Sequence, residues 1–222
     1  MGLDMYLYRF PRYKGYGAKD VMAINDYLDW LESDDGKKYS LEEWCGVKEE
    51  DIPKGEDLEY FKGLRKVTYC DWDTEHRWPE VKSYENVAYW RKANAVHKWF
   101  VEAVQGGEDD CDFHDEVTRG VLERLRDICA KVIESAVLVQ GKIQNGYSVR
   151  GGKLEPIMVD GKYILDASVC DELLPTGSGY FFGGTDYDEY YLGDVNDTFD
   201  ICNRLLEETD FENQMIYYRS SW

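Results

Sequence analysis

The sequence predicts an α+β fold in a single domain, residues 1–222, with a mainly antiparallel sheet packed by about three main helices. Near each end of the chain is a run with apolar side chains at both odd and even positions, namely Leu3–Phe10 and Gln214–Tyr218. Such runs are typical of strands that are covered on both faces. Helical spacing of apolar residues recurs between these ends and favours helices packed on the sheet. We therefore expect the N- and C-terminal strands to lie inside the sheet.

Composition sets the class of protein. The chain has 222 residues, 43% of them hydrophobic, which is enough for a sizeable core. No apolar run approaches the ~20 residues of a membrane helix, and the opening MGLDMYLYRFPRYK carries an aspartate where a signal peptide is basic. Six cysteines without a C-x-x-C pair are typical of reduced thiols. We expect a cytoplasmic protein without membrane contacts.

The formal net charge of −19 is the strongest global signal. It argues against direct binding to nucleic acids or anionic membranes, because cations are needed to displace counterions from phosphates. The carboxylates are concentrated: Lys19–Glu59 holds fourteen acids against five lysines, and Asp186–Glu212 holds ten acids against Arg204 alone. Two interpretations stay open, namely ordinary solvated faces of an acidic protein and an acidic surface that binds a basic protein.

The first third of the chain predicts two helices and a long insertion. Ala18–Glu32 has apolar residues at helical spacing and stops at a turn. Ser40 and Glu43 fit a capping box at the start of a short helix. Residues 36–80 otherwise have a weak pattern, with one β-prone run of poor alternation at Lys66–Trp72. We expect this segment to be an insertion.

Asn86–Val104 predicts one continuous buried helix, because its apolar residues gather in one broad sector at ~100° per residue. His97 lies inside this sector, and Lys92 lies at its margin beside Trp99. His97 is then a core imidazole held by hydrogen bonds, a ligand-contacting or catalytic group, or a metal ligand. Lys92 either extends over the Trp99 ring or takes part with it in stacking a nucleotide ring.

The middle of the chain predicts a helix followed by hairpins. His114–Ser135 has the pattern of an amphipathic helix. Cys111 and His114 have half the spacing of a zinc site, but no second Cys/His pair completes a tetrahedron, so no metal site is predicted. Val137–Leu165 is β-prone and divided by turn dipeptides, which predicts small antiparallel hairpins. We treat residues 140–165 as a second insertion.

The stretch LLPTGSGYFFGGTDYDEYY, residues 173–191, combines a turn, a short buried strand at Tyr180–Phe182 and an acidic loop. We expect that strand beside the two terminal strands. The stretch has neither the GxGxxG frame nor the Lys-[Ser/Thr] ending of a phosphate loop, so no cofactor is predicted. A calcium loop counted from Asp186 lacks the required glycine. Its carboxylates either cap a helix predicted at Val195–Glu208 or form a pair for acid–base work.

Four motifs together resemble an uncharacterised protein family of bacterial genomes, phages and prophages. They are MGLDMY at the start, YWRKANAVHKW at Tyr89–Trp99, LPTGSGYFFGGTDYDEY at Leu174–Tyr190 and YRSSW at Tyr218–Trp222. Relatives often have Phe where Tyr180 stands here. Some relatives carry an automatic phosphoglycerate kinase assignment, but that two-domain enzyme is much longer, and nothing here supplies its nucleotide and phosphoglycerate sites. The resemblance implies a bacterial host cytosol as the setting and carries over no catalytic residue.

Three hypotheses about function follow, and we expect binding rather than catalysis. The favoured one is a phage or mobile-element accessory protein whose acidic surface binds a basic host protein, as an inhibitor or DNA mimic does. Its expected contact residues are Asp186, Asp188, Glu189 and Tyr190. The second is a protein or enzyme with a nucleotide-like small ligand, lined by Trp90, Lys92, Asn94, His97, Phe182 and Tyr187. The third is a structural or oligomerising protein.

Overall fold

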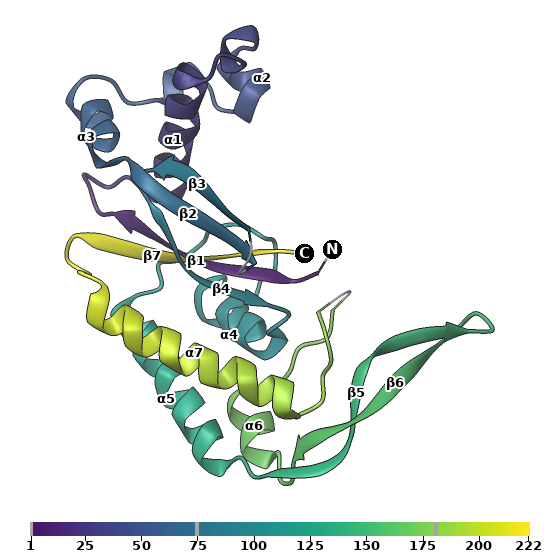
Figure 1. Cartoon of the computed structure of the whole chain (residues 1–222). Helices are drawn as coiled ribbons and strands as arrows, with labels where there is room; N and C mark the ends of the chain where they lie inside the picture. The colour runs from purple at the N-terminus through teal and green to yellow at the C-terminus, as the bar shows by residue number, and fades with distance from the viewer. Residues whose placement is uncertain (1, 74–75, 180–181) are drawn as a thin grey trace. The chain divides into compact units, whose positions relative to one another are not determined.

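The computed structural model describes residues 2–73, 76–179 and 182–222, and it has the α+β architecture that the sequence predicts (Figure 1). The chain groups into two compact units. Unit 1 comprises Met1–Leu7, Ala88–Thr209 and Tyr218–Trp222, and unit 2 comprises Tyr8–Val87 and Asp210–Tyr217. The assignment of the chain to one domain with insertions at 36–80 and 140–165 stays a prediction.

Strands from both ends of the chain lie in one three-stranded sheet with the order β4-β1-β7. These strands are β1 (Asp4–Pro11), β4 (Glu85–Arg91) and β7 (Gln214–Ser221). The Lys92 amide, just after β4, donates to the Leu3 carbonyl at 2.8 Å. At the other end of β1, the Arg12 amide donates to the Asn213 carbonyl at 2.8 Å. Both pairings are antiparallel, and the prediction that the terminal strands lie inside the sheet is confirmed.

In the described residues, the third strand of this sheet is β4, whereas the sequence predicts the segment Tyr180–Phe182 beside the terminal strands. Tyr180 and Phe181 lie outside the described residues. Phe182 is buried but has no regular secondary structure. The next residue, Gly183, has a φ of 97°, which lies in the left-handed region that strands do not use.

The continuous helix predicted over Asn86–Val104 is wrong in its first half, where the chain forms β4 before α4 (Asn94–Val104). Ala88 and Trp90 of β4 are both buried, so the apolar run also fits the two-residue period of a strand. Lys92 separates the two elements with a φ of 62°, at which neither a helix nor a strand continues. Pairing of β4 with β1 decides between the two periods.

Unit 1 contains two long helices that run side by side, α5 (Arg119–Ser135) and α7 (Glu189–Glu208) (Figure 1). Both bury aliphatic and thiol side chains: Leu122, Leu125, Cys129 and Val132 from α5, and Val195, Cys202 and Leu205 from α7. The short helix α6 (Ser168–Leu173) packs on α5. The amphipathic pattern of α5 in the sequence therefore identifies its buried face correctly.

The starts of these two helices differ from the prediction because capping side chains set them. α5 begins five residues after His114, since the Thr118 hydroxyl accepts a hydrogen bond from the Val121 amide at 3.4 Å. α7 begins at Glu189 instead of Val195, since the carboxylate of Asp188 accepts from the first helical amides. The prediction that a carboxylate of this loop caps the helix is confirmed.

Residues 138–164 form one long hairpin of β5 (Leu138–Arg150) and β6 (Lys153–Ile164), where the sequence predicts several small ones. The hairpin turns at Gly151-Gly152, where both residues have positive φ. The dipeptide Asn145-Gly146 falls at a bulge in β5, and Asp160-Gly161 stays inside β6. Turn dipeptides thus mark a bulge and a strand interior here as well as a turn.

Unit 2 contains the capped helices of the N-terminal third. α1 (Ala18–Glu32) has the predicted bounds. The capping box at the start of α2 (Leu41–Cys45) is confirmed: the Ser40 hydroxyl accepts from the Glu43 amide at 3.3 Å, and the Glu43 carboxylate accepts from the Ser40 amide at 2.9 Å. The other elements are η1 (Gly36–Lys38), η2 (Glu49–Asp51), α3 (Glu56–Leu64), β2 (Lys66–Asp73) and β3 (His76–Lys82).

Five described cysteines are free thiols: Cys45, Cys111, Cys129, Cys170 and Cys202. In the part of the chain that the structure describes, no helix has the length and apolarity needed to cross a membrane. Within the same residues, no three His, Cys, Asp or Glu side chains gather in a way that would hold a metal ion.

Candidate functional site

His97 is the central polar residue of the ligand site predicted from the sequence, and it is only 3% exposed. Its Nδ1 lies 2.7 Å from the Tyr218 hydroxyl, and its Nε2 lies 2.9 Å from the Asp109 carboxylate. The same carboxylate accepts a hydrogen bond from the Trp222 indole at 2.9 Å. Because both ring nitrogens are paired, this geometry matches the interpretation of His97 as a core imidazole.

A carboxylate, an imidazole and a hydroxyl follow one another at Asp109, His97 and Tyr218. Enzymes use groups in this order to activate a hydroxyl for nucleophilic attack. The Tyr218 hydroxyl, however, belongs to a residue that is 1% exposed, and burial raises its pKa well above the ordinary value. A buried hydroxyl that keeps its proton is a poor nucleophile and lies out of reach of a substrate. The arrangement favours a rigid internal network over catalysis.

Asn94 ties the acidic loop region to the start of α4. Its side-chain amide donates to the carbonyl oxygens of Phe182 at 3.2 Å and Gly184 at 2.7 Å. Its side-chain oxygen accepts from the Gly177 amide at 3.0 Å. One buried side chain thus satisfies three backbone groups of the segment that leads into the acidic loop.

The Phe182 ring packs edge-on against His97, with ring centres 5.1 Å apart, and edge-on against Trp222, with ring centres 6.0 Å apart.

Lys92 is exposed, and its backbone lies close to Gly183. A Cβ atom added to this glycine would stand 3.4 Å from the Lys92 carbonyl oxygen. The structure therefore brings Asn94, His97 and Phe182 together and places Lys92 beside them.

Trp90 and Tyr187 make separate contacts. The Trp90 indole donates to the Thr198 hydroxyl at 3.0 Å inside the core. The Tyr187 hydroxyl donates to the Asp171 carboxylate at 2.8 Å. The stacking partner expected for Lys92 is also engaged elsewhere, since the Arg124 guanidinium lies 5.4 Å from the centre of the Trp99 ring. Of the six predicted ligand residues, Trp90, Asn94, His97 and Tyr187 make hydrogen bonds within the chain, Phe182 packs against His97, and Lys92 is exposed.

Two of the four predicted partner residues have structural roles. Asp188 is 6% exposed and accepts from the amides of Tyr190 and Tyr191 at 2.9 and 3.0 Å. Burial raises the pKa of the Asp188 carboxyl, although these two hydrogen bonds act in the opposite direction. The Glu189 carboxylate accepts from the Lys162 amide in β6 at 3.0 Å. The exposed members of the predicted set are Asp186 and Tyr190.

Further exposed carboxylates continue this surface along α7. Asp197 and Asp200 follow Tyr190 by seven and ten residues, and a helix places such positions within roughly 80° of one another. We call Asp186, Tyr190, Asp197 and Asp200 the acidic stripe. Asp194 lies between them in sequence but is half-buried, and burial raises its pKa to about 7. Asp197 and Asp200 are absent from the contact residues predicted from the sequence, although their helical spacing from Tyr190 carries that signal.

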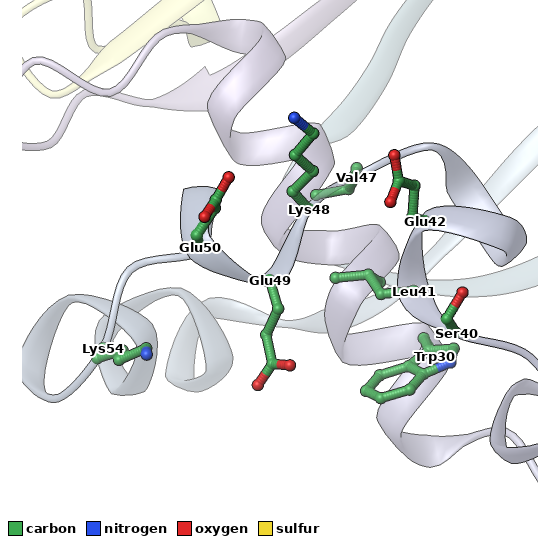
Figure 2. Close-up of a pocket in the computed structure, with 9 residues that line it drawn as sticks. All are labelled: Trp30, Ser40, Leu41, Glu42, Val47, Lys48, Glu49, Glu50 and Lys54. Atoms are coloured by element: carbon green, nitrogen blue, oxygen red, sulfur yellow. The ribbon is translucent and has the colours of Figure 1, made fainter.

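A broad, open depression of about 750 Å³ lies in unit 2, far in sequence from the predicted site residues (Figure 2). The Trp30 indole in its wall is fixed by donation to the Tyr39 carbonyl at 2.9 Å. No sequence motif marks this depression, because its lining comes from α1, from α2 and from the segment between α2 and α3. The lining residues include Trp30, Leu41, Glu42, Val47, Lys48, Glu49, Glu50 and Lys54.

Comparisons of this chain with protein-family models, with curated proteins and with solved structures give no match. Its function is therefore to be inferred from its own geometry and charge.

Proposed function

We propose that the chain acts by binding a protein with a basic surface, and that the acidic stripe on α7 and the loop before it makes the contact. The observation that carries this proposal is Tyr190, which is 58% exposed at the head of the row of carboxylates. Tyrosine combines a large apolar area with a polar tip and few rotatable bonds, which makes it a frequent anchor of protein interfaces. The carboxylates around it then select a basic partner.

The rigidity of this surface supports the proposal. The cap by Asp188 and the packing on α5 hold α7 in place, and Asn94 holds the segment that leads into it. A surface that is ordered before binding loses little conformational entropy on association. The net charge of −19 adds long-range attraction for a cationic partner, which raises the association rate at low salt.

The sequence motifs support a biological setting for this activity. Their resemblance to a family of phages and prophages leads us to propose an accessory protein of a mobile element that acts in the bacterial cytoplasm. The partner is then a basic host protein, and the chain acts on it as an inhibitor or a mimic of DNA. A mimic of DNA presents carboxylates where DNA presents phosphates, and the acidic stripe has that chemistry.

Charge reversal of the stripe tests the proposal. In the variant Asp186→Lys/Asp197→Lys/Asp200→Lys, we expect the loss of the proteins that the wild-type chain captures from a bacterial lysate at low salt. Asp188 and Glu189 are left unchanged because they hold the start of α7 and β6. The matched control reverses three exposed carboxylates elsewhere in unit 1, Glu102, Glu108 and Asp115.

The two variants have the same net charge, so only the position of the charges differs. A set of captured proteins that is the same for the stripe variant and the wild type would contradict the proposal. An equal loss in the control variant would contradict it too, because binding would then follow net charge alone. Tyr190→Ala, which leaves the charge unchanged, is expected to weaken capture at high as well as low salt.

A further inference from the structure

The base of the β5–β6 hairpin, in unit 1, lies beside the start of α7 (Figure 1). The Ile164 amide at the end of β6 donates to the Tyr187 carbonyl at 2.9 Å. Tyr163 pairs with Asp188 in an antiparallel bridge. The base of the hairpin is therefore held against the segment in which the acidic stripe begins.

Three apolar side chains gather at this base, and we call them the base patch: Val137, Tyr163 and Leu165. The Leu165 amide donates to the Val137 carbonyl at 2.9 Å, so these two residues extend the hairpin by one more pairing. Residues two apart along a strand point to the same face of a sheet, which places Tyr163 beside Leu165. The base patch is thus one contiguous surface of the hairpin.

All three side chains of the base patch are exposed to solvent. Leu165 is 63% exposed, Val137 is 58% exposed and Tyr163 is 40% exposed. The Tyr163 ring packs over Gly141, since a Cβ atom on this glycine would stand 2.5 Å from the ring. Neighbouring exposed apolar side chains, unlike single ones, are typical of interaction surfaces. Because the strands are already paired at this point, the patch is ordered before binding.

Carboxylates accompany the base patch. The three segments that form the hairpin base and its surroundings hold seven carboxylates and one lysine, in residues 134–139, 162–172 and 185–190. Asp166 directly follows Leu165 and is exposed, and so is Asp186, which directly precedes Tyr187. Since the two paired segments run antiparallel, Leu165 and Asp186 lie at the same end of the pairing. The patch therefore adjoins the first carboxylate of the acidic stripe.

Charge decides among the candidate occupants of the base patch. The phosphates of nucleic acids and of anionic lipids are repelled by the carboxylates beside it. A second copy of this chain, docked patch to patch, would bring two sets of these carboxylates together, at a cost in electrostatic free energy. A cationic segment with apolar side chains of its own suits both the patch and the carboxylates.

We propose that the base patch and the acidic stripe bind one partner, a basic protein segment that presents apolar side chains beside its cations. This inference rests on the function proposed above and defines the chemistry of the partner. The apolar side chains of the partner cover the base patch, and its cations meet Asp186 and the carboxylates along α7. Burial of the patch adds free energy that salt does not screen, whereas the attraction between exposed charges falls with ionic strength.

Two synthetic peptides test the proposal. One places leucines at helical spacing among lysines, and the other has serines in place of the leucines, so both peptides carry the same charge. Fluorescence anisotropy of the labelled peptides with the full chain gives the dissociation constants at low and at high salt. We expect the leucine–lysine peptide to bind at least about tenfold tighter than the serine–lysine peptide, and we expect this ratio to persist at high salt.

A matched pair of variants locates the effect. Val137→Ser/Leu165→Ser removes the two most exposed side chains of the base patch and keeps the net charge, and it should bind the two peptides alike. The control is Val149→Ser/Met158→Ser, at two apolar residues of the same hairpin that are 72% and 49% exposed. This control should keep the wild-type ratio. Circular dichroism melting of both variants verifies that they fold like the wild type.

Contrary outcomes separate this proposal from the function proposed above. Equal binding of the two peptides by the wild-type chain, or an unchanged ratio in Val137→Ser/Leu165→Ser, overturns the role of the base patch. If Asp186→Lys/Asp197→Lys/Asp200→Lys then binds neither peptide, the acidic stripe stands as the binding surface without the patch. If this stripe variant binds both peptides as the wild type does, the acidic stripe is contradicted, and the inference about its partner falls with it.

Two further results would also overturn the proposal. A wild-type chain that binds neither peptide contradicts the acidic stripe and the base patch together. In sedimentation equilibrium, a wild-type dimer that Val137→Ser/Leu165→Ser converts to a monomer would show that a second copy of the chain covers the patch, in place of a cationic partner.

Discussion

Asp194 shows how one buried carboxyl makes stability depend on pH. Burial raises its pKa to about 7, and the charges of Asp197 and Asp188 act in the same direction. In the unfolded chain the pKa lies near 3.8. The folded state therefore binds the proton more tightly, so the contribution of this group to stability is complete below about pH 4 and is lost as the pH rises through 7.

We compare the free energy of unfolding of Asp194→Asn with that of the wild type. Between pH 5 and pH 8, we expect this difference to shift in favour of the variant by on the order of 2 kcal/mol. The amide cannot ionise and has nearly the same shape. Urea unfolding of both proteins at the two pH values gives the comparison. Asp200→Asn, on the exposed face of the same helix, serves as the control and should follow the wild type. Equal stability differences at both pH values for Asp194→Asn would refute the prediction.

Tyr218 is the second residue whose role can be measured. Tyr218→Phe removes the hydroxyl 2.7 Å from Nδ1 of His97 and leaves a buried ring nitrogen without that partner. We expect a loss of about 1–3 kcal/mol in the free energy of unfolding by urea, the usual cost of an unpaired buried polar group. Tyr190→Phe, at an exposed tyrosine, should cost much less. Similar losses for the two substitutions would mean that the network contributes little.

His97 also shows how far single residues could be predicted. The apolar pattern around His97 allowed several roles, and a buried core imidazole was one of them, because Val96 and Phe100 lie nearby on the same helix. Its partners Asp109 and Tyr218 are separated from it by 12 and 121 residues. No local spacing encodes such contacts, so the roles of His97 remained open in the sequence.

The segment that leads into α7 depends on one side chain of α4. We expect Asn94→Ala to lower the free energy of unfolding by about 2–3 kcal/mol, because the carbonyl of Phe182 and the amide of Gly177 lose a buried partner. Hydrogen exchange of residues 176–179 and 182–184 should accelerate more than exchange in α5. Asn196→Ala, on the exposed side of α7, is the control. Unchanged exchange of this segment would show that other contacts hold it.

Elements with strong local signals were predicted well. α1 has the predicted bounds, and the capping box at Ser40 forms with both of its hydrogen bonds. Both features depend on residues three or four positions apart. β4 was mistaken for a helix because its apolar run satisfies both periods, and only the neighbouring β1 favours the strand. The hairpin was divided into smaller ones because Asn-Gly also suits a bulge.

Three buried thiols in unit 1 give a test of whether its helices unfold together. Cys129, Cys170 and Cys202 lie on α5, α6 and α7 and are at most 1% exposed. Burial raises the pKa of each thiol, to about 12 for Cys202. Since the thiolate is the reactive form, these three groups should react with a maleimide only when the unit unfolds.

Mass spectrometry of labelled peptides measures this directly. In the native protein, Cys111, which is half-exposed, should be labelled first, and the three buried thiols should be labelled together at one much slower rate. In denaturant all of them react. Labelling of one buried thiol at the rate of Cys111 would show that its helix opens separately from the other two.

The order of amino acids was enough to predict the α+β class, the two terminal strands, the buried faces of the main helices and the strong acidity of the chain. These properties follow from composition and from contacts within about four residues, which a linear pattern records. Three features could be found only in the folded chain: Asn86–Arg91 is a strand, His97 pairs with Tyr218, and unit 2 contains an open depression lined by apolar and charged side chains. Each of these depends on surfaces brought together from distant parts of the chain, whose free energy of burial no local pattern contains.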